Sequence, residues 1–206
     1  MALTKVRGAG LGTLGDGTAN DTKIVFDGNA VDYHIGLDDS ADSLIIGKGS
    51  ALGTTTSMSV DTNGFVLKPS TPGFSCTAGD GHTSTGNLTA TAVTWGNIYH
   101  NFGSHLSGTT FTVPVTGRYF VTFGGIAGAS STGSAGRMEM HVNGSVVSIQ
   151  ARGEEGASYS QMASSYIIQL TLNDACTVRI HDRGMWTGGS DTAGSNDPHW
   201  SMYLLG

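Results

Sequence analysis

Short runs in which apolar and polar residues alternate extend along nearly the whole chain. Between Val31 and Asp38, for example, Val31, Tyr33, Ile35 and Leu37 alternate with polar or small residues. A period of two is typical of a strand with one buried face. No stretch shows the sustained i, i+3, i+4, i+7 spacing of an amphipathic helix. The pattern therefore predicts an all-β protein.

The runs divide the chain into three regions. Residues 1–21 are rich in glycine and poor in large apolar side chains, which predicts an extended arm. Residues 22–72 contain four short strand candidates and end in the proline-containing linker VLKPSTP. Four short strands bury too little surface to be stable alone, and association with further copies would supply the rest. We therefore expect a small β-rich trimeric stalk module. Residues 73–206 contain nine longer runs separated by turn signals, which predicts a sandwich or jelly-roll head domain.

Some runs of the head region are apolar at consecutive positions, so that both faces of the strand are apolar. This holds for 117–123, 166–170 and 200–205, whereas 137–142 and 176–181 alternate strictly. One sheet of the sandwich should therefore have a second apolar face, and further copies of the same chain are its simplest cover. The candidate interface residues are Phe120, Tyr166, Tyr203 and Leu205.

The run WGNIYHNFGSHLSGTTFTVPVTGRYFVTF, residues 95–123, resembles the signature of the complement C-one-q globular domain, a relative of tumour necrosis factor. Two features depart from that signature: the interval between Leu106 and Phe111 is two residues short, and Val121 stands where an aromatic is usual. The resemblance implies a trimeric, ten-strand-type jelly roll over 73–206. The matching positions are Trp95, Asn101, Leu106, Phe111, Gly117, Tyr119 and Phe123.

The run KIVFDGNAVDYHIGLDDSADSLIIGKGSALGTT in the second region resembles a module of marine bacteriophage tail-fibre and other virion proteins. The resemblance implies a place on the tail or head surface of a virion. The arm would then contact phage tail or capsid proteins. We expect synthesis in the host cytoplasm, because the N-terminus lacks the apolar core of a signal peptide.

Composition narrows the functional classes. The formal net charge is −6 and only 13% of the 206 residues are charged, so no basic stripe is available for nucleic acid. No window approaches the 18 apolar residues of a membrane span, so no membrane insertion is expected. The two cysteines, Cys76 and Cys176, lie in apolar strand patterns, which favours buried free thiols over a disulfide or a nucleophile.

Candidate chemistry is sparse. Gly10, Gly12 and Gly15 have the G-x-G-x-x-G spacing of a dinucleotide-binding turn, but no helix pattern follows them. Glu154 and Glu155 are adjacent, so in an extended chain their side chains point apart. The seven histidines show no ligand spacing. We therefore expect no enzyme activity, no cofactor and no metal site, with one alternative left open: Ca²⁺ at the trimer apex.

Short and long connections alternate between the strands of the head region, so the long ones at 127–136, 152–160 and 184–198 should share one end. The third combines an aromatic side chain with amide and carboxylate groups, as sugar-binding surfaces do. The alternative is that the aromatic ring packs beneath its own loop. The candidate receptor-binding residues are Trp186, Asp191, Asn196 and Asp197.

Together these features predict a homotrimeric bacteriophage fibre protein whose distal jelly-roll head binds a host-surface glycan or protein. A capsid decoration or purely structural fibre protein is the alternative. A polysaccharide depolymerase fits less well, because no pair of carboxylates is suitably spaced.

Overall fold

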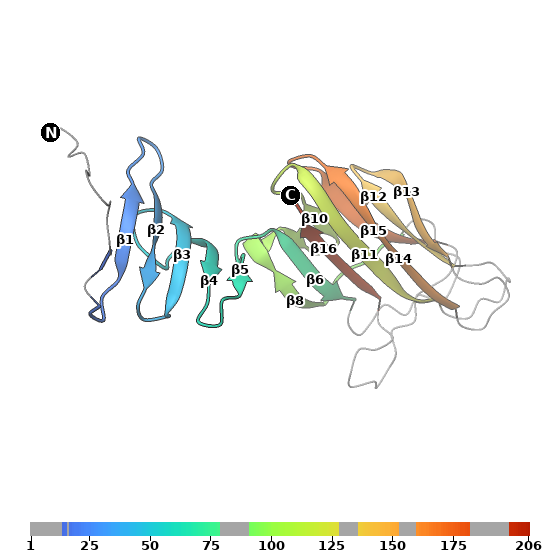
Figure 1. Cartoon of the computed structure of the whole chain (residues 1–206). Helices are drawn as coiled ribbons and strands as arrows, with labels where there is room; N and C mark the ends of the chain where they lie inside the picture. The colour runs from blue at the N-terminus through green and yellow to red at the C-terminus, as the bar shows by residue number, and fades with distance from the viewer. Residues whose placement is uncertain (1–13, 16, 79–90, 128–135, 153–159, 182–197) are drawn as a thin grey trace. The chain divides into compact units, whose positions relative to one another are not determined.

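The computed structural model describes residues 14–15, 17–78, 91–127, 136–152, 160–181 and 198–206. These residues form antiparallel strands and one short 3-10 turn, Phe102–Ser104, so the predicted all-β class is confirmed. The chain divides into two compact units, Met1–Thr71 and Pro72–Gly206 (Figure 1). Among the described residues, no helix has the length and apolarity required to cross a membrane.

The first unit is a single antiparallel sheet in which each strand pairs with the next one along the chain. An Asx turn joins the last two strands: Asp61 Oδ1 accepts hydrogen bonds from the backbone N–H groups of Phe65, at 2.8 Å, and Asn63, at 2.9 Å. These bonds lower the pKa of Asp61, that from Phe65 most. The strands are β1 (Thr22–Phe26), β2 (Tyr33–Asp38), β3 (Ser43–Lys48), β4 (Thr56–Val60) and β5 (Val66–Leu67).

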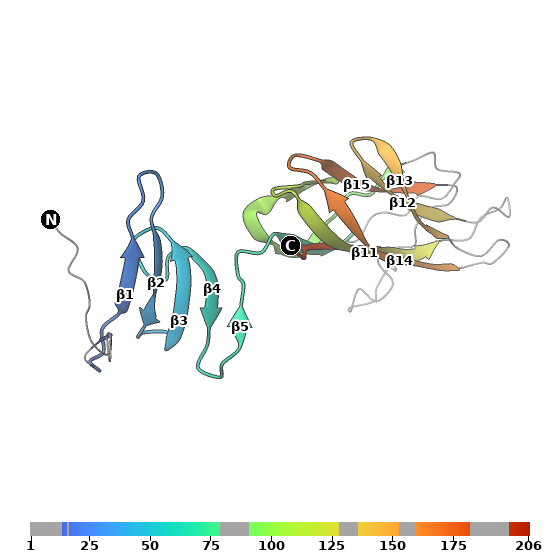
Figure 2. The same ribbon diagram turned by 45° about the horizontal axis from the view of Figure 1, so that its top comes forward.

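The second unit consists of two facing sheets, which are separated most clearly in Figure 2. One has the strand order β14-β11-β16-β6-β8, and the other has the order β13-β12-β15-β10-β9, with β7 against β15. Sequence neighbours such as β10 and β11 lie in different sheets, as in a jelly roll, so the predicted fold is confirmed. The strands are β6 (Gly73–Thr77), β7 (Thr91–Ala92), β8 (Asn97–Asn101), β9 (Leu106–Ser107), β10 (Thr110–Thr112), β11 (Gly117–Ala127), β12 (Arg137–Val142), β13 (Ser145–Arg152), β14 (Ser160–Leu170), β15 (Ala175–His181) and β16 (His199–Leu204).

The core lies between these two sheets. Its centre is an aromatic cluster in which the Phe74 ring lies 4.8 Å from Phe111 and 4.6 Å from Trp200, measured between centroids. The residues that carry the C-one-q resemblance are mostly structural. Trp95, Leu106, Phe111, Tyr119 and Phe123 are all buried. The signature therefore reports how the sandwich packs rather than what it binds.

The register of the strands sorts the connections of the sandwich into two ends. At one end Gly117 pairs with Leu170, Val142 with Ser145, and Gly73 with Tyr203. At the opposite end Ala127 pairs with Ser160, Arg137 with His181, and Thr77 with His199. The short connections therefore lie where the chain enters the second unit, and the strand ends that flank the long connections lie at the other end, as the sequence predicts.

Candidate assembly interface

One face of the β1–β5 sheet is apolar across all five strands. Residues directly opposite each other on paired strands lie on the same face. One row across the sheet is Ile24, Ile35, Ile46 and Met58. The adjacent row is Leu37, Leu44, Val60 and Val66. The strands thus present a continuous apolar surface, which we call the stalk face.

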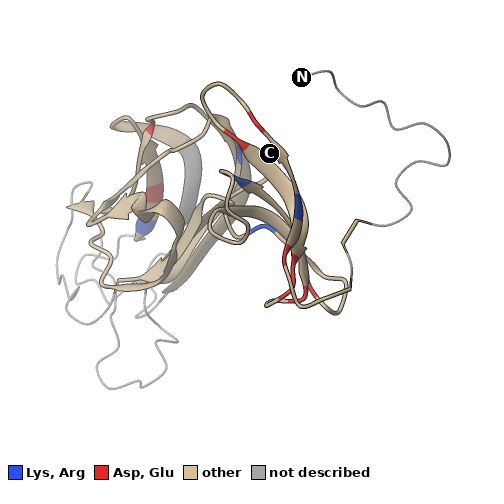
Figure 3. Ribbon diagram, turned by 90° about the vertical axis from the view of Figure 1, so that its left-hand side faces the viewer, with Lys and Arg blue, Asp and Glu red and all other residues tan. Residues whose placement is uncertain are grey.

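The stalk face is exposed. The side chains of Phe26, Tyr33, Leu37 and Leu44 remain 59, 51, 47 and 45% accessible. Charged residues occupy little of the ribbon, and the acidic ones gather in turns (Figure 3). Asp39 and Asp42, for example, lie in the turn between β2 and β3. A large apolar surface of this kind marks an interaction site in a soluble domain.

The other face of the same sheet is partly covered by the chain itself. His34 and Ile45 are buried on it, and the His34 ring lies so close over Gly47 that a Cβ there would be 2.6 Å from Nε2. The segment after β3 crosses this face: His34 Nδ1 lies 2.7 Å from the Gly49 carbonyl oxygen, and Lys23 Nζ donates to the Ser50 carbonyl at 2.6 Å. This face is therefore covered around His34 and Ile45, although Val25 and Leu67 at its edges stay exposed, whereas the stalk face is open throughout.

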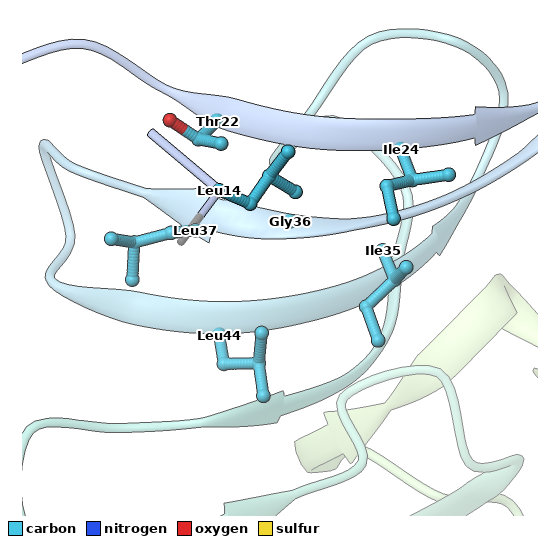
Figure 4. A pocket seen from close by; sticks show the side chains of 7 residues that line it. All are labelled: Leu14, Thr22, Ile24, Ile35, Gly36, Leu37 and Leu44. Atoms are coloured by element: carbon cyan, nitrogen blue, oxygen red, sulfur yellow. The ribbon is translucent and has the colours of Figure 1, made fainter. Parts of the chain in front are cut away.

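The stalk face contains a shallow hollow of about 290 Å³ (Figure 4). Its wall includes Leu14, which precedes β1 and is itself 52% exposed. Except for Thr22, the side chains around it are hydrocarbon, so the hollow suits an apolar side chain and offers nothing to orient a polar ligand. The lining residues are Leu14, Thr22, Ile24, Ile35, Gly36, Leu37 and Leu44.

A second exposed apolar surface lies on the outer face of the β14-β11-β16 sheet, and we call it the head patch. Phe120 pairs with Ile167 on one side and with Tyr203 on the other. Their exposed fractions are 37, 60 and 37%, and that of nearby Leu205 is 56%. The Tyr203 ring lies flat over Gly73, where a Cβ would be 2.5 Å from Cδ1. Glycine at this position allows the ring to lie across the neighbouring strand.

Hydroxyl groups replace apolar groups farther along this outer face. Ser165 donates to Thr122 Oγ1 at 3.0 Å, and Ser201 donates to Ser75 Oγ at 3.1 Å. The expectation of a sheet that is apolar on both faces therefore holds only near the end where the chain enters the second unit. These hydroxyl groups hydrogen-bond to one another across neighbouring strands, so a partner need not supply those bonds.

Three of the four residues that the sequence assigns to an interface, Phe120, Tyr203 and Leu205, are exposed in or beside the head patch. Tyr166 is not part of it. Its ring contacts Phe123 edge to face at 6.2 Å, its hydroxyl donates to Met140 Sδ, and burial raises its pKa. Adjacent residues of a strand point to opposite faces, so Ile167 takes the exposed position instead.

The candidate receptor-binding residues Trp186, Asp191, Asn196 and Asp197 lie outside the described residues. The same is true of Gly10, Gly12, Glu154 and Glu155. Gly15 is described, and the next regular element after it is strand β1 rather than a helix. The structural context that a dinucleotide-binding turn needs is therefore not met.

Cys76 and Cys176 are buried and unpaired, as predicted. Burial raises the pKa of both thiols to about 12, so both remain protonated at neutral pH. They behave as small apolar side chains of the core.

A buried polar cluster lies on β12 and β15, the two strands whose apolar and polar residues alternate strictly. Glu139 and His141 are 5 and 7% exposed. His181 Nε2 and His141 Nε2 lie 2.7 and 3.3 Å from Glu139 Oε2, and Arg137 Nε lies 2.9 Å from Glu139 Oε1. The two-residue spacing of Glu139 and His141 on a strand is readable from the sequence, but the position of His181 follows only from strand pairing.

Comparison with solved structures finds proteins of similar fold. The globular domain of the zebrafish complement 1qA protein matches with 14% identity and a TM-score of 0.45, over 66% of this chain and 98% of that one. Murine APRIL, in crystal structures at pH 5.0 and pH 8.0, matches with 14 and 15% identity and a TM-score of 0.48, over 66% of this chain and 99% of that one. No protein-family model matches the chain, and no curated protein sequence matches it. The jelly-roll assignment itself follows from the strand order given above.

Proposed function

We propose that this chain is a homotrimeric virion fibre protein, in which the β1–β5 sheet forms a stalk and the jelly roll forms a head that binds the host surface. The observation that carries the proposal is the open stalk face, because a single-layer sheet with one uncovered apolar face requires a partner layer. The chain carries two such surfaces, one in each unit, and further copies of itself would cover both. The number three comes from the sequence resemblance to C-one-q domains.

The mass of the assembly in solution tests the proposed trimer. Sedimentation equilibrium of the full chain should give three times the chain mass at micromolar concentration. Phe120→Asp and Leu44→Asp each place a charge in an apolar interface, so either variant should dissociate or precipitate. Thr112→Asp, at an exposed position on strand β10, is the matched control and should remain trimeric. A folded wild-type monomer at the same concentration would overturn the proposal.

The receptor-binding part of the proposal rests on the composition of residues 184–198. Trimers present three sites at once, and multivalency raises avidity by about a hundredfold or more. Adsorption of labelled trimer to host cells, compared between wild type and Trp186→Ala, tests it. The variant should adsorb more weakly at an unchanged melting temperature. Unchanged adsorption would leave a structural fibre or decoration protein, and release of reducing ends from host polysaccharide would indicate a depolymerase.

A further inference from the structure

We propose that Glu139, His141 and His181 form a binding site for a transition-metal dication, with Zn²⁺ as the expected ion. One ligand atom from each of the three residues lies within 4.8 Å of the other two, and both Nε2 atoms lie close to Glu139 Oε2. Two imidazoles and one carboxylate are a common three-ligand set for Zn²⁺, which leaves a fourth position for water. The site is separate from both apolar surfaces and does not depend on the proposed assembly.

The spacing of the ligand atoms suits a tetrahedral ion. Ligands about 2.0–2.1 Å from Zn²⁺ lie about 3.3 Å from one another. His141 Nε2 is already 3.3 Å from Glu139 Oε2, and His181 Nε2, at 2.7 Å, would need to move outward by roughly half an ångström. The two rings are nearly parallel, with an interplanar angle of 15° and centroids 6.5 Å apart. Their ligand nitrogens, which lie within 4.8 Å of each other, would have to come to about 3.3 Å as well.

The second nitrogen of the His141 ring has a backbone partner that orients the ring. His141 Nδ1 lies 3.3 Å from the Gly144 carbonyl oxygen, which can only accept, so this nitrogen carries the ring proton. The other nitrogen, Nε2, faces Glu139 Oε2 at 3.3 Å and is the one placed to bind a metal. A backbone carbonyl on the second nitrogen is also the usual support of a metal-binding histidine.

Arg137 limits the affinity but does not block the site. Its Nε atom contacts Oε1, the other carboxylate oxygen, and so orients the group while leaving Oε2 to the metal. Its Nη2 atom lies 3.4 Å from His181 Nδ1, which would have to carry the ring proton once Nε2 binds a metal. That contact and the nearby positive charge should keep the affinity in the micromolar range. Arg137→Gln offers a neutral amide that can accept this proton, so it should bind Zn²⁺ severalfold more tightly.

Calorimetric titration of the untagged, chelator-treated full chain with Zn²⁺ tests the proposal. We expect one ion per chain at micromolar affinity. His141→Ala and His181→Ala should each weaken binding at least tenfold, and the double variant should abolish it. His105→Ala, which changes a histidine outside the cluster, should bind as wild type does. Absence of stoichiometric binding to wild type, or undiminished binding to the double variant, would overturn the site.

A measurement on the wild type alone guards against variants that fail to fold. Long-range ¹⁵N NMR of the histidine rings identifies which nitrogens change when Zn²⁺ is added. The Nε2 resonances of His141 and His181 should shift together with saturation at one equivalent. If neither resonance shifts while Zn²⁺ is bound, the metal lies elsewhere. In that case the proposal is wrong.

Discussion

The β1–β5 sheet and the jelly roll are built from strands with the same alternation of apolar and polar residues, but only the jelly roll encloses its apolar faces. In the sandwich two sheets face each other, and Phe111, Tyr119, Phe123 and Trp200 are fully buried between them. In the first unit the rows that contain Ile24 and Leu37 have no second sheet among the described residues. The same pattern therefore produces a self-sufficient core in one unit and an open face in the other.

The difference shows that strand patterning alone does not decide whether a region is stable by itself. What matters is whether the chain supplies a second layer close enough to cover the first. The second unit has enough strands for two sheets, whereas the first has five, the last of them only two residues long, and forms one sheet. A sheet with one open apolar face depends on association, and so its stability should depend on concentration.

The largest expected effect comes from separating the two units. A fragment of residues 72–206 should fold with a cooperative melting transition, because its core lies within the unit. A fragment of residues 1–71 should lack dispersed amide resonances at low micromolar concentration, because its apolar rows remain open to water. Heteronuclear NMR and circular dichroism of both fragments check this. A well-dispersed monomeric spectrum from the shorter fragment would mean that its sheet is stable alone.

The two cysteines test whether the core of the sandwich is closed, since both lie in that unit. Because burial raises the pKa of Cys76 and Cys176 to about 12, neither forms a thiolate at neutral pH in the folded state. Native protein should react with a disulfide reagent orders of magnitude more slowly than denatured protein, which should release two equivalents per chain. Rapid reaction of either thiol in the native protein would show that the sandwich opens locally there.

A matched pair of alanine substitutions then compares the two regions directly. Phe111→Ala should lower the free energy of unfolding of the sandwich by about 3–5 kcal/mol, independently of protein concentration. Leu37→Ala, at a side chain of the first unit that is 47% exposed, should change the free energy of unfolding by less than about 1 kcal/mol in dilute protein. The Leu37 variant should instead raise the concentration needed for assembly. Equal, concentration-independent losses in denaturant titrations would contradict the contrast.

The smallest effect concerns pH. Desolvation lowers the pKa of His199, which begins strand β16, below its usual 6.5. The unfolded chain therefore takes up a proton at His199 before the folded chain does, and stability is lost as the pH falls through 6.5 toward the lowered value. His199→Gln should remove this contribution, so the variant should lose less stability than the wild type between the two pH values. Denaturant titrations of both proteins at pH 7.5 and pH 5.5, about one unit on either side of 6.5, measure this difference in stability.

Several features could be predicted from the sequence because they depend on local pattern. The strand class follows from the period of two, and the grouping of connections at two ends follows from the alternation of short and long intervals. The buried thiols follow from their apolar strand positions. Each of these depends on residues close together in the chain, where the sequence spacing of two residues decides whether their side chains point to the same face of a strand.

Other features required the tertiary structure because they depend on which strands become neighbours. The consecutive apolar residues at Tyr166 and Ile167 left open which one faces outward, and only the packing of Tyr166 against Met140 decides it. His181 joins Glu139 and His141 because β15 pairs with β12, although about forty residues separate them in the sequence. Long-range pairing sets both outcomes, and the free energy that selects it comes from burying apolar surface across the whole sandwich. The sequence thus determined the strands and the side chains that they carry, and the fold decided which of those side chains meet.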